Sequence, residues 1–211
     1  MALSTYSQLK SAVADWLERG DLADRTGDFI VLAESRLNRL LRLRALEIDQ
    51  ALTATPGGRT IALPAGFREP VALWLEGPGG REAMRFADPA TLLTSPAAGQ
   101  PRLWTLDGGV VAFERPCDRA YGFTLRMLGR LALSDAQPTN AALTDYPDLY
   151  LFGALVEAAP YLRDAELLSL FAARFEGALL EARAKEARAR SLAPLGVESA
   201  LAASGAFDIR R

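Results

Sequence analysis

The fold of this chain is set by one long apolar stretch, PDLYLFGALVEAAPYLRDAELLSLFAARFEGALLEARAKEARARS, which runs from Pro147 to Ser191. Its large apolar residues recur three and four positions apart, which predicts one helix over Pro147–Arg163 and a second over Asp164–Arg190. Pro160 lies inside the first segment, where a proline removes a backbone donor and should kink or end the helix. We therefore expect a helical hairpin near the C-terminus, with a polar extension after Leu180 exposed on every side.

The N-terminal part of the chain shows the same helical spacing. We predict a helix over Tyr6–Arg19, with Thr5 or Ser4 as its N-cap and Gly20 as its stop. A second helix is predicted over Asp28–Arg42.

Between these helical ends the apolar residues alternate, as they do in strands. Turns rich in glycine and proline separate six or so short strands, drawn from Leu46–Ala54, Arg59–Leu63, Val71–Gly77, Arg81–Ala87, Pro101–Gly108, Gly109–Pro116 and Tyr121–Ala132. This pattern is typical of a small antiparallel sandwich or barrel.

Local turn chemistry predicts how some of these strands connect. Thr55-Pro56-Gly57-Gly58 suits a type II turn, so we expect Leu46–Ala54 and Arg59–Leu63 to form a hairpin. A second hairpin is expected around Asp107-Gly108-Gly109. The Asp-Pro pair that opens Asp88–Ser95 favours a short helix.

The predicted fold class is therefore α+β. A helical bundle would be built from residues 1–44 and 133–191, with a β-rich module inserted at 45–132 and an extended tail at 192–211.

Composition excludes several kinds of chemistry. The 211 residues carry a formal net charge of -2, with no histidine and one cysteine. The missing histidine excludes Ser-His-Asp and Cys-His catalysis and any zinc site that contains histidine. The near-neutral charge lacks the basic footprint of a nucleic-acid-binding domain. No signal peptide and no membrane-spanning run is predicted, so we expect a soluble protein made in the cytoplasm.

No motif points to catalysis. Phosphate-binding glycine loops are missing from the sequence, and Cys117 has no histidine to activate it. Carboxylates such as Glu34, Asp145 and Asp148 are expected at helix starts or on polar helix faces. Trp74 and Trp104 would pack in a core or an interface, although a carbohydrate-binding or base-stacking platform is the alternative. We predict no catalytic residue, no metal site and no cofactor.

Arginines gather on two of the predicted helices, at Arg36, Arg39 and Arg42 and at Arg183 and Arg188. They form either a solvated face or a contact patch for an acidic partner. The chain ends in Phe207, Asp208, Ile209, Arg210 and Arg211, which mix apolar and charged side chains. This tail is either disordered or a segment that orders on a partner.

The order of these segments resembles a known family, the head-to-tail adaptors of tailed bacteriophages. The likeness is to the adaptors of SU10-like phages and, more distantly, to T7-type tail tubular protein A. It covers residues 1–185 and is carried by LSTYSQLKSAVADWLERGDL, DFIVLAESRLNRLLRLR, LPAGFREP, QPRLWTLDGGVVAFERP and LALSDAQPTNAALTDYPDLYLFGALVEAAPYLRDAE. Within the last of these lie Pro138-Thr139-Asn140, Pro147-Asp148-Leu149-Tyr150 and Glu157-Ala158-Ala159-Pro160.

The resemblance implies a structural virion protein rather than an enzyme. Such adaptors form a dodecameric ring of identical subunits beneath the portal protein, offer a platform to a tail or nozzle protein, and let double-stranded DNA pass without sequence-specific binding. It further implies that the tail with Phe207–Arg211 docks on the portal. The charge pattern separately suggests that Arg36, Arg39, Arg42, Arg183 and Arg188 meet acidic patches of a neighbouring subunit or of the portal, and no membrane is expected as a partner.

Two alternatives rest on the residues alone. One is a carbohydrate-binding or hydrolytic module at the host envelope, suggested by the tryptophans and the scattered carboxylates. The other is a regulatory helical DNA-binding protein, which the charge disfavours because no basic recognition helix is evident.

Overall fold

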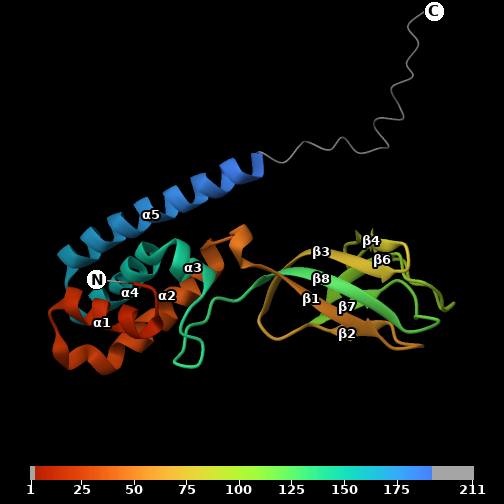
Figure 1. Cartoon of the computed structure of the whole chain (residues 1–211), viewed down its shortest axis with the longest axis horizontal. Helices are drawn as coiled ribbons and strands as arrows, with labels where there is room; N and C mark the ends of the chain where they lie inside the picture. The colour runs from red at the N-terminus through yellow and green to blue at the C-terminus, as the bar shows by residue number, and fades with distance from the viewer. Residues whose placement is uncertain (1–2, 192–211) are drawn as a thin grey trace, which may run out of the picture.

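The computed structural model describes residues 3–191, which form a helical bundle and a β-rich module at its side (Figure 1). The predicted α+β class is confirmed. The bundle contains α1 (Tyr6–Leu17), α2 (Thr26–Leu40), α3 (Ala141–Asp145), α4 (Pro147–Leu162) and α5 (Ala165–Ser191), with 3-10 turns η1 (Gly20–Arg25) and η2 (Arg44–Leu46).

Helix α4 is the centre of the bundle and contacts α1, α2 and α5. Buried residues lie on every side of it, including Leu149, Leu151 and Val156, as expected for a helix enclosed by others. Gly153 allows the closest approach: a Cβ atom built there would lie 3.3 Å from the Ala33 Cβ and 3.4 Å from the Phe175 ring. The apolar hairpin therefore supplies the bundle core, as predicted.

The helix ends follow local chemistry, with one exception. The Thr5 side chain caps α1 by accepting a hydrogen bond from the Gln8 backbone N–H, which confirms that N-cap. The stop predicted at Gly20 is wrong: Glu18 takes the left-handed conformation with φ of 51° and ends the helix earlier. Pro160 stands in the last turn of α4, which ends at Leu162 because Arg163 takes the left-handed conformation with φ of 57°.

The β-rich module consists of two four-stranded sheets. One has the order β1-β8-β3-β4, with β1 (Glu47–Ala54), β8 (Tyr121–Gly129), β3 (Phe67–Gly77) and β4 (Gly80–Ala83). The other has the order β2-β7-β6-β5, with β2 (Thr60–Ala62), β7 (Val110–Phe113), β6 (Leu103–Asp107) and β5 (Arg85–Phe86). Their buried side chains form one cluster that includes Leu73, Leu75, Val111, Phe113, Phe123 and Leu125. All pairs are antiparallel except β5 with β6, which is parallel.

The two predicted hairpins have different outcomes. The turn at Thr55–Gly58 is present, because the Gly58 N–H donates to the Thr55 carbonyl at 3.0 Å and Gly57 has φ of +74°. The hairpin itself is wrong: β1 pairs with β8 and β2 pairs with β7, so this turn links two sheets. The hairpin of β6 and β7 is confirmed, with Asp107 opposite Val110.

The segment after β4 also differs from the prediction. The expected strand Arg81–Ala87 is divided at Met84 between β4 in one sheet and β5 in the other. No helix forms over Asp88–Ser95, where only a turn is found; the Asp88 carboxylate accepts a hydrogen bond from the Ala90 N–H at 2.8 Å and so closes a local turn instead of capping a helix. Conversely, the short helix α3 lies in a stretch expected to be a connector.

Candidate partner-binding surface

Helices α2 and α5 both lie on α4, and a cleft of about 520 Å³ separates their outer faces. It is lined by Arg36, Arg39, Leu40, Phe175, Glu176, Leu179, Leu180 and Arg183. Three of the five arginines predicted as contact residues thus come together at one place. The cleft has an apolar floor and a positive rim, since three guanidinium groups face one carboxylate.

Arg36 is held in place by the core helix beneath it. Its guanidinium forms an ion pair with Glu157 of α4 at 3.0 Å and lies 5.7 Å from the centroid of the Phe175 ring. A cation over an aromatic ring is attracted by the ring's negative face. Arg36 is therefore a structural link between α2, α4 and α5 as well as part of the rim.

The side chains of Arg39 and Arg183 differ in whether they already form a hydrogen bond within the subunit. Arg183 donates to the Leu40 carbonyl at 3.2 Å, which is a free carbonyl at the end of α2. The Arg39 side chain is exposed and forms no ion pair or hydrogen bond within the described part of the chain. Its guanidinium is available to a partner.

Arg42 continues the positive surface past the end of α2. It pairs with Glu69 of β3 at 2.7 Å and, with Arg183, lines an adjoining cleft of about 280 Å³. Leu180 projects into the main cleft with 66% of its surface exposed, which is high for a leucine.

Arg188 does not join this group. It lies on the opposite side of α5 and lines a second cleft, of about 560 Å³. The other residues that line this second cleft are Asp145, Tyr146, Asp148, Ala178, Glu181, Ala182, Ala184 and Lys185. Lys185 stands 5.0 Å from the centroid of the Tyr146 ring. The prediction of a fully exposed extension after Leu180 is wrong, because Ala182 is completely buried and Arg183 is bonded to α2.

The junction between bundle and module is polar and lies next to Arg39. The Asn38 side chain donates to the Leu131 carbonyl at 3.0 Å and accepts from the Leu131 N–H at 2.8 Å. Arg68, in the LPAGFREP segment, donates to the Leu41 carbonyl. Burial lowers the pKa of Arg68, and the nearby Arg42 lowers it further, while Glu69 opposes both effects. The LPAGFREP segment thus fastens the module to the end of α2.

A buried polar network, missed at the level of sequence, joins α2 to the start of α3 and α4. Glu34 is 6% exposed, so its expected place on a polar helix face is wrong. The Tyr150 hydroxyl donates to the Glu34 carboxylate at 3.2 Å and accepts from the Asn140 side-chain amide at 2.6 Å. Burial raises the pKa of Glu34, against the opposing hydrogen bonds from Tyr150 and the Leu133 backbone. The missed signal was an acidic residue at a position that continues the apolar stripe through Ile30, Ala33 and Leu37.

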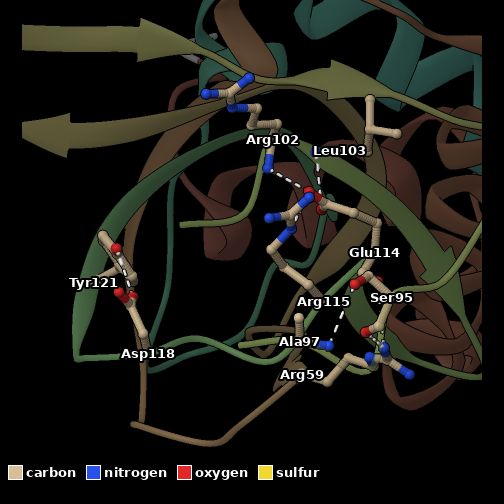
Figure 2. Close-up of polar contacts among 9 residues, drawn as sticks. All are labelled: Arg59, Ser95, Ala97, Arg102, Leu103, Glu114, Arg115, Asp118 and Tyr121. Carbon is tan, nitrogen blue, oxygen red and sulfur yellow. Dashed lines mark hydrogen bonds and ion pairs between the residues drawn. The ribbon is translucent and has the colours of Figure 1, made fainter. Parts of the chain in front are cut away.

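A second network in the β-rich module was also missed (Figure 2). Glu114, directly after β7, is 5% exposed, and its carboxylate accepts hydrogen bonds from the backbone N–H groups of Arg102 and Leu103 at 2.9 and 3.0 Å. Arg115 adds an ion pair at 3.2 Å, and Arg59 donates to the carbonyls of Ser95 and Glu114. The long loop before β6 is therefore pinned by one acidic side chain, although no short motif marks it.

The remaining candidates offer no sign of a carbohydrate platform. Trp104 is 2% exposed and donates to the Met84 carbonyl at 3.3 Å, so its core role is confirmed. Trp74 is covered in part by Arg81 and Arg126, whose guanidinium carbons lie 5.7 and 5.1 Å from the ring centroid. Cys117 is buried, and burial raises the pKa of its thiol, as do Asp118 and Glu114.

Within residues 3–191, no three acidic or cysteine side chains gather as metal ligands would. None of the described helices is both long and apolar enough to cross a membrane. The predicted docking residues Phe207, Asp208, Ile209, Arg210 and Arg211 lie outside the described residues.

Comparison with known proteins gives one family match, which spans almost the whole chain. A family model described as SU10 adaptor protein matches residues 4–198. A search of curated proteins found no match.

Proposed function

Because the chain belongs to the SU10 adaptor protein family, we propose that it is the head-to-tail adaptor of a tailed bacteriophage, assembled as a dodecameric ring beneath the portal. The family makes it a structural phage protein, and this match is the observation that carries the proposal. In the ring it would join capsid to tail, present a platform to a tail or nozzle protein, and form part of the DNA channel. It would be made in the host cytoplasm and act in the virion.

The arginine cleft supports a role in assembly. A positive rim around an apolar floor favours protein partners, since charge steers the encounter and apolar burial stabilises the contact. We propose that Arg36, Arg39, Arg42, Arg183 and Arg188 contact a neighbouring subunit or the portal, and that Phe207–Arg211 dock on the portal.

The charge of the chain suits a DNA channel. With a net charge of -2, the subunit would not hold phosphates as a basic wall would. A strongly positive channel wall in the assembled ring would contradict this part of the proposal.

The direct test is imaging of the chain together with the portal protein encoded by the same phage. Class averages should show a twelve-fold ring stacked on the portal. Portal particles that stay bare at saturating adaptor concentrations, or that carry single copies without a ring, would contradict the proposed function.

Truncation after Ser191 tests the docking of the tail. The truncated chain should keep the circular dichroism spectrum and melting temperature of the full chain while its attachment to the portal weakens. Unchanged attachment would remove the tail from the proposal and leave the ring untouched.

A further inference from the structure

Helix α5 separates two clefts that face in opposite directions. Arg183 lines the cleft shared with α2, while Glu181 and Lys185, two residues before and after it, line the cleft shared with α3 and the start of α4. Two residues along a helix correspond to about 200° of rotation. The two surfaces therefore do not overlap and can be occupied at the same time.

The two surfaces carry charges of opposite sign. The cleft at α2 has Arg36, Arg39 and Arg183 against the single Glu176. The cleft at α3 has Asp145, Asp148 and Glu181 against Lys185 and Arg188. Of the guanidinium groups in the first cleft, that of Arg39 is exposed and forms no ion pair or hydrogen bond within residues 3–191.

Apolar area accompanies the charge in the first cleft. Leu180, with 66% of its surface exposed, lines this cleft together with the buried Leu179 and Phe175. This mixture favours binding of an acidic protein surface that also has apolar area, rather than of a nucleic-acid backbone. Glu176 would repel phosphates, and a bound nucleic acid would leave Leu180 exposed to water.

We propose that the cleft between α2 and α5 of one copy receives the opposite side of α5 of a second copy, with Arg39 and Arg183 facing Asp145, Asp148 and Glu181. This inference rests on the proposed ring. A closed ring needs a heterologous contact, in which two different faces of the same chain meet. Helix α5 contributes to both faces, with Arg183 on one and Glu181 on the other, so each subunit would present its basic side to one neighbour and its acidic side to the other.

Charge reversal with rescue tests this contact. Arg39→Glu alone and Glu181→Arg alone should each lower the fraction of portal particles with a complete ring roughly tenfold, because like charges then face each other. The double variant Arg39→Glu with Glu181→Arg restores opposite signs and should recover ring formation. The matched control is Arg174→Glu, an exposed arginine of α5 that lines neither cleft.

The readout is the ring fraction on portal particles by electron microscopy, with melting curves to show that each variant is folded. Rings that form equally well with Arg39→Glu overturn the inference, as does an equal loss with Arg174→Glu or a failure of the double variant to recover. Loss of portal attachment by Arg39→Glu with free rings intact also overturns it, since the cleft would then bind the portal. If the unmodified chain forms no ring on the portal, the proposed function itself fails.

Discussion

Polar contacts give structural roles to several residues of the segment that leads back from the β-rich module into the bundle. Asn140 caps α3 and bonds to Tyr150, which bonds to Glu34 on α2. A second member of the same segment, Pro138, accepts a hydrogen bond from the Tyr6 N–H at 2.7 Å. These residues fix where the chain re-enters the bundle after the β-rich module. Their role is structural, because Asn140 and Tyr150 pair the buried Glu34 carboxylate with polar partners, and Pro138 supplies an acceptor to the first N–H of α1.

The raised pKa of Glu34 makes a prediction about stability and pH. The folded state holds a proton on this carboxyl at pH values where the unfolded state has lost it, so stability falls as the pH rises from about 4 through the folded-state pKa. Glu34→Gln cannot titrate and can still accept from Tyr150. The stability difference between the variant and the original chain should therefore grow in favour of the variant from pH 4 to pH 7, as measured by urea denaturation.

Glu176→Gln is the matched control for that measurement, since it removes the same charge from an exposed position of α5. A Glu34→Gln difference that stays constant across this pH range would show that the buried carboxyl does not titrate as inferred.

Glu114 provides a second prediction at this scale. Glu114→Ala should leave the N–H groups of Arg102 and Leu103 without their acceptor and cost about 1–3 kcal/mol of stability. Hydrogen exchange at these two amides should accelerate, because they are bonded to this carboxylate alone among the side chains described. Glu82→Ala, on the exposed strand β4, should change neither quantity; equal effects of both substitutions would contradict the assignment.

At the scale of secondary-structure elements, the conformation of a turn is predictable from its residues, whereas the pairing partner of a strand is not. The type II turn at Thr55–Gly58 forms as its residues require, yet the strands that flank it enter different sheets. The partner of β1 is β8, which lies at the far end of the module sequence. Turn residues fix the direction of the chain over four positions, whereas strand pairing depends on burial between distant segments. The same reasoning explains the strand divided at Met84.

The close packing of α4 can be tested at Gly153. Gly153→Leu should destabilise the bundle by about 1–3 kcal/mol, because its side chain would meet the Ala33 Cβ and the Phe175 ring and overpack the core. Gly177→Ala on α5 should instead stabilise by about 0.5–1 kcal/mol, since a Cβ there meets nothing within 4 Å and alanine favours the helix. Thermal melts of both variants give the comparison, and a neutral Gly153→Leu would mean that α2 and α5 can move apart freely.

At the scale of the whole molecule, the sequence predicted the two parts but not the surface between helices. The arginine pattern grouped Arg36, Arg39 and Arg183, and these three line one cleft because α2 and α5 both pack on α4; their shared role in binding stays a prediction. It placed Arg188 with them, although its helical position turns it to the other side of α5. Which side a residue faces depends on how the helix is rotated about its axis, and that is set by burial of Phe171, Phe175, Leu179 and Ala182.

The junction of the two parts yields a prediction on the whole chain. We propose that the bundle and the β-rich module are separate units joined rigidly by Asn38, Arg68 and the ion pair of Arg42 with Glu69. Asn38→Ala removes both hydrogen bonds to Leu131, so exchange of the Leu131 amide should accelerate and small-angle scattering should show a wider range of shapes. Ser35→Ala, one turn earlier on α2, is the control. Identical scattering profiles for both variants would argue against this role of Asn38.

The two strands that carry the chain into and out of the β-rich module, β1 and β8, are antiparallel neighbours, with Glu47 opposite Leu128. Both ends of the insertion therefore leave the bundle within about 5 Å of each other. A gap of that size can be closed by a tight turn, so the bundle could exchange this module for another of different size without moving its helices. Evolution could then remodel what such a protein presents to its surroundings by recombination at two nearby points, leaving the helical surfaces unchanged.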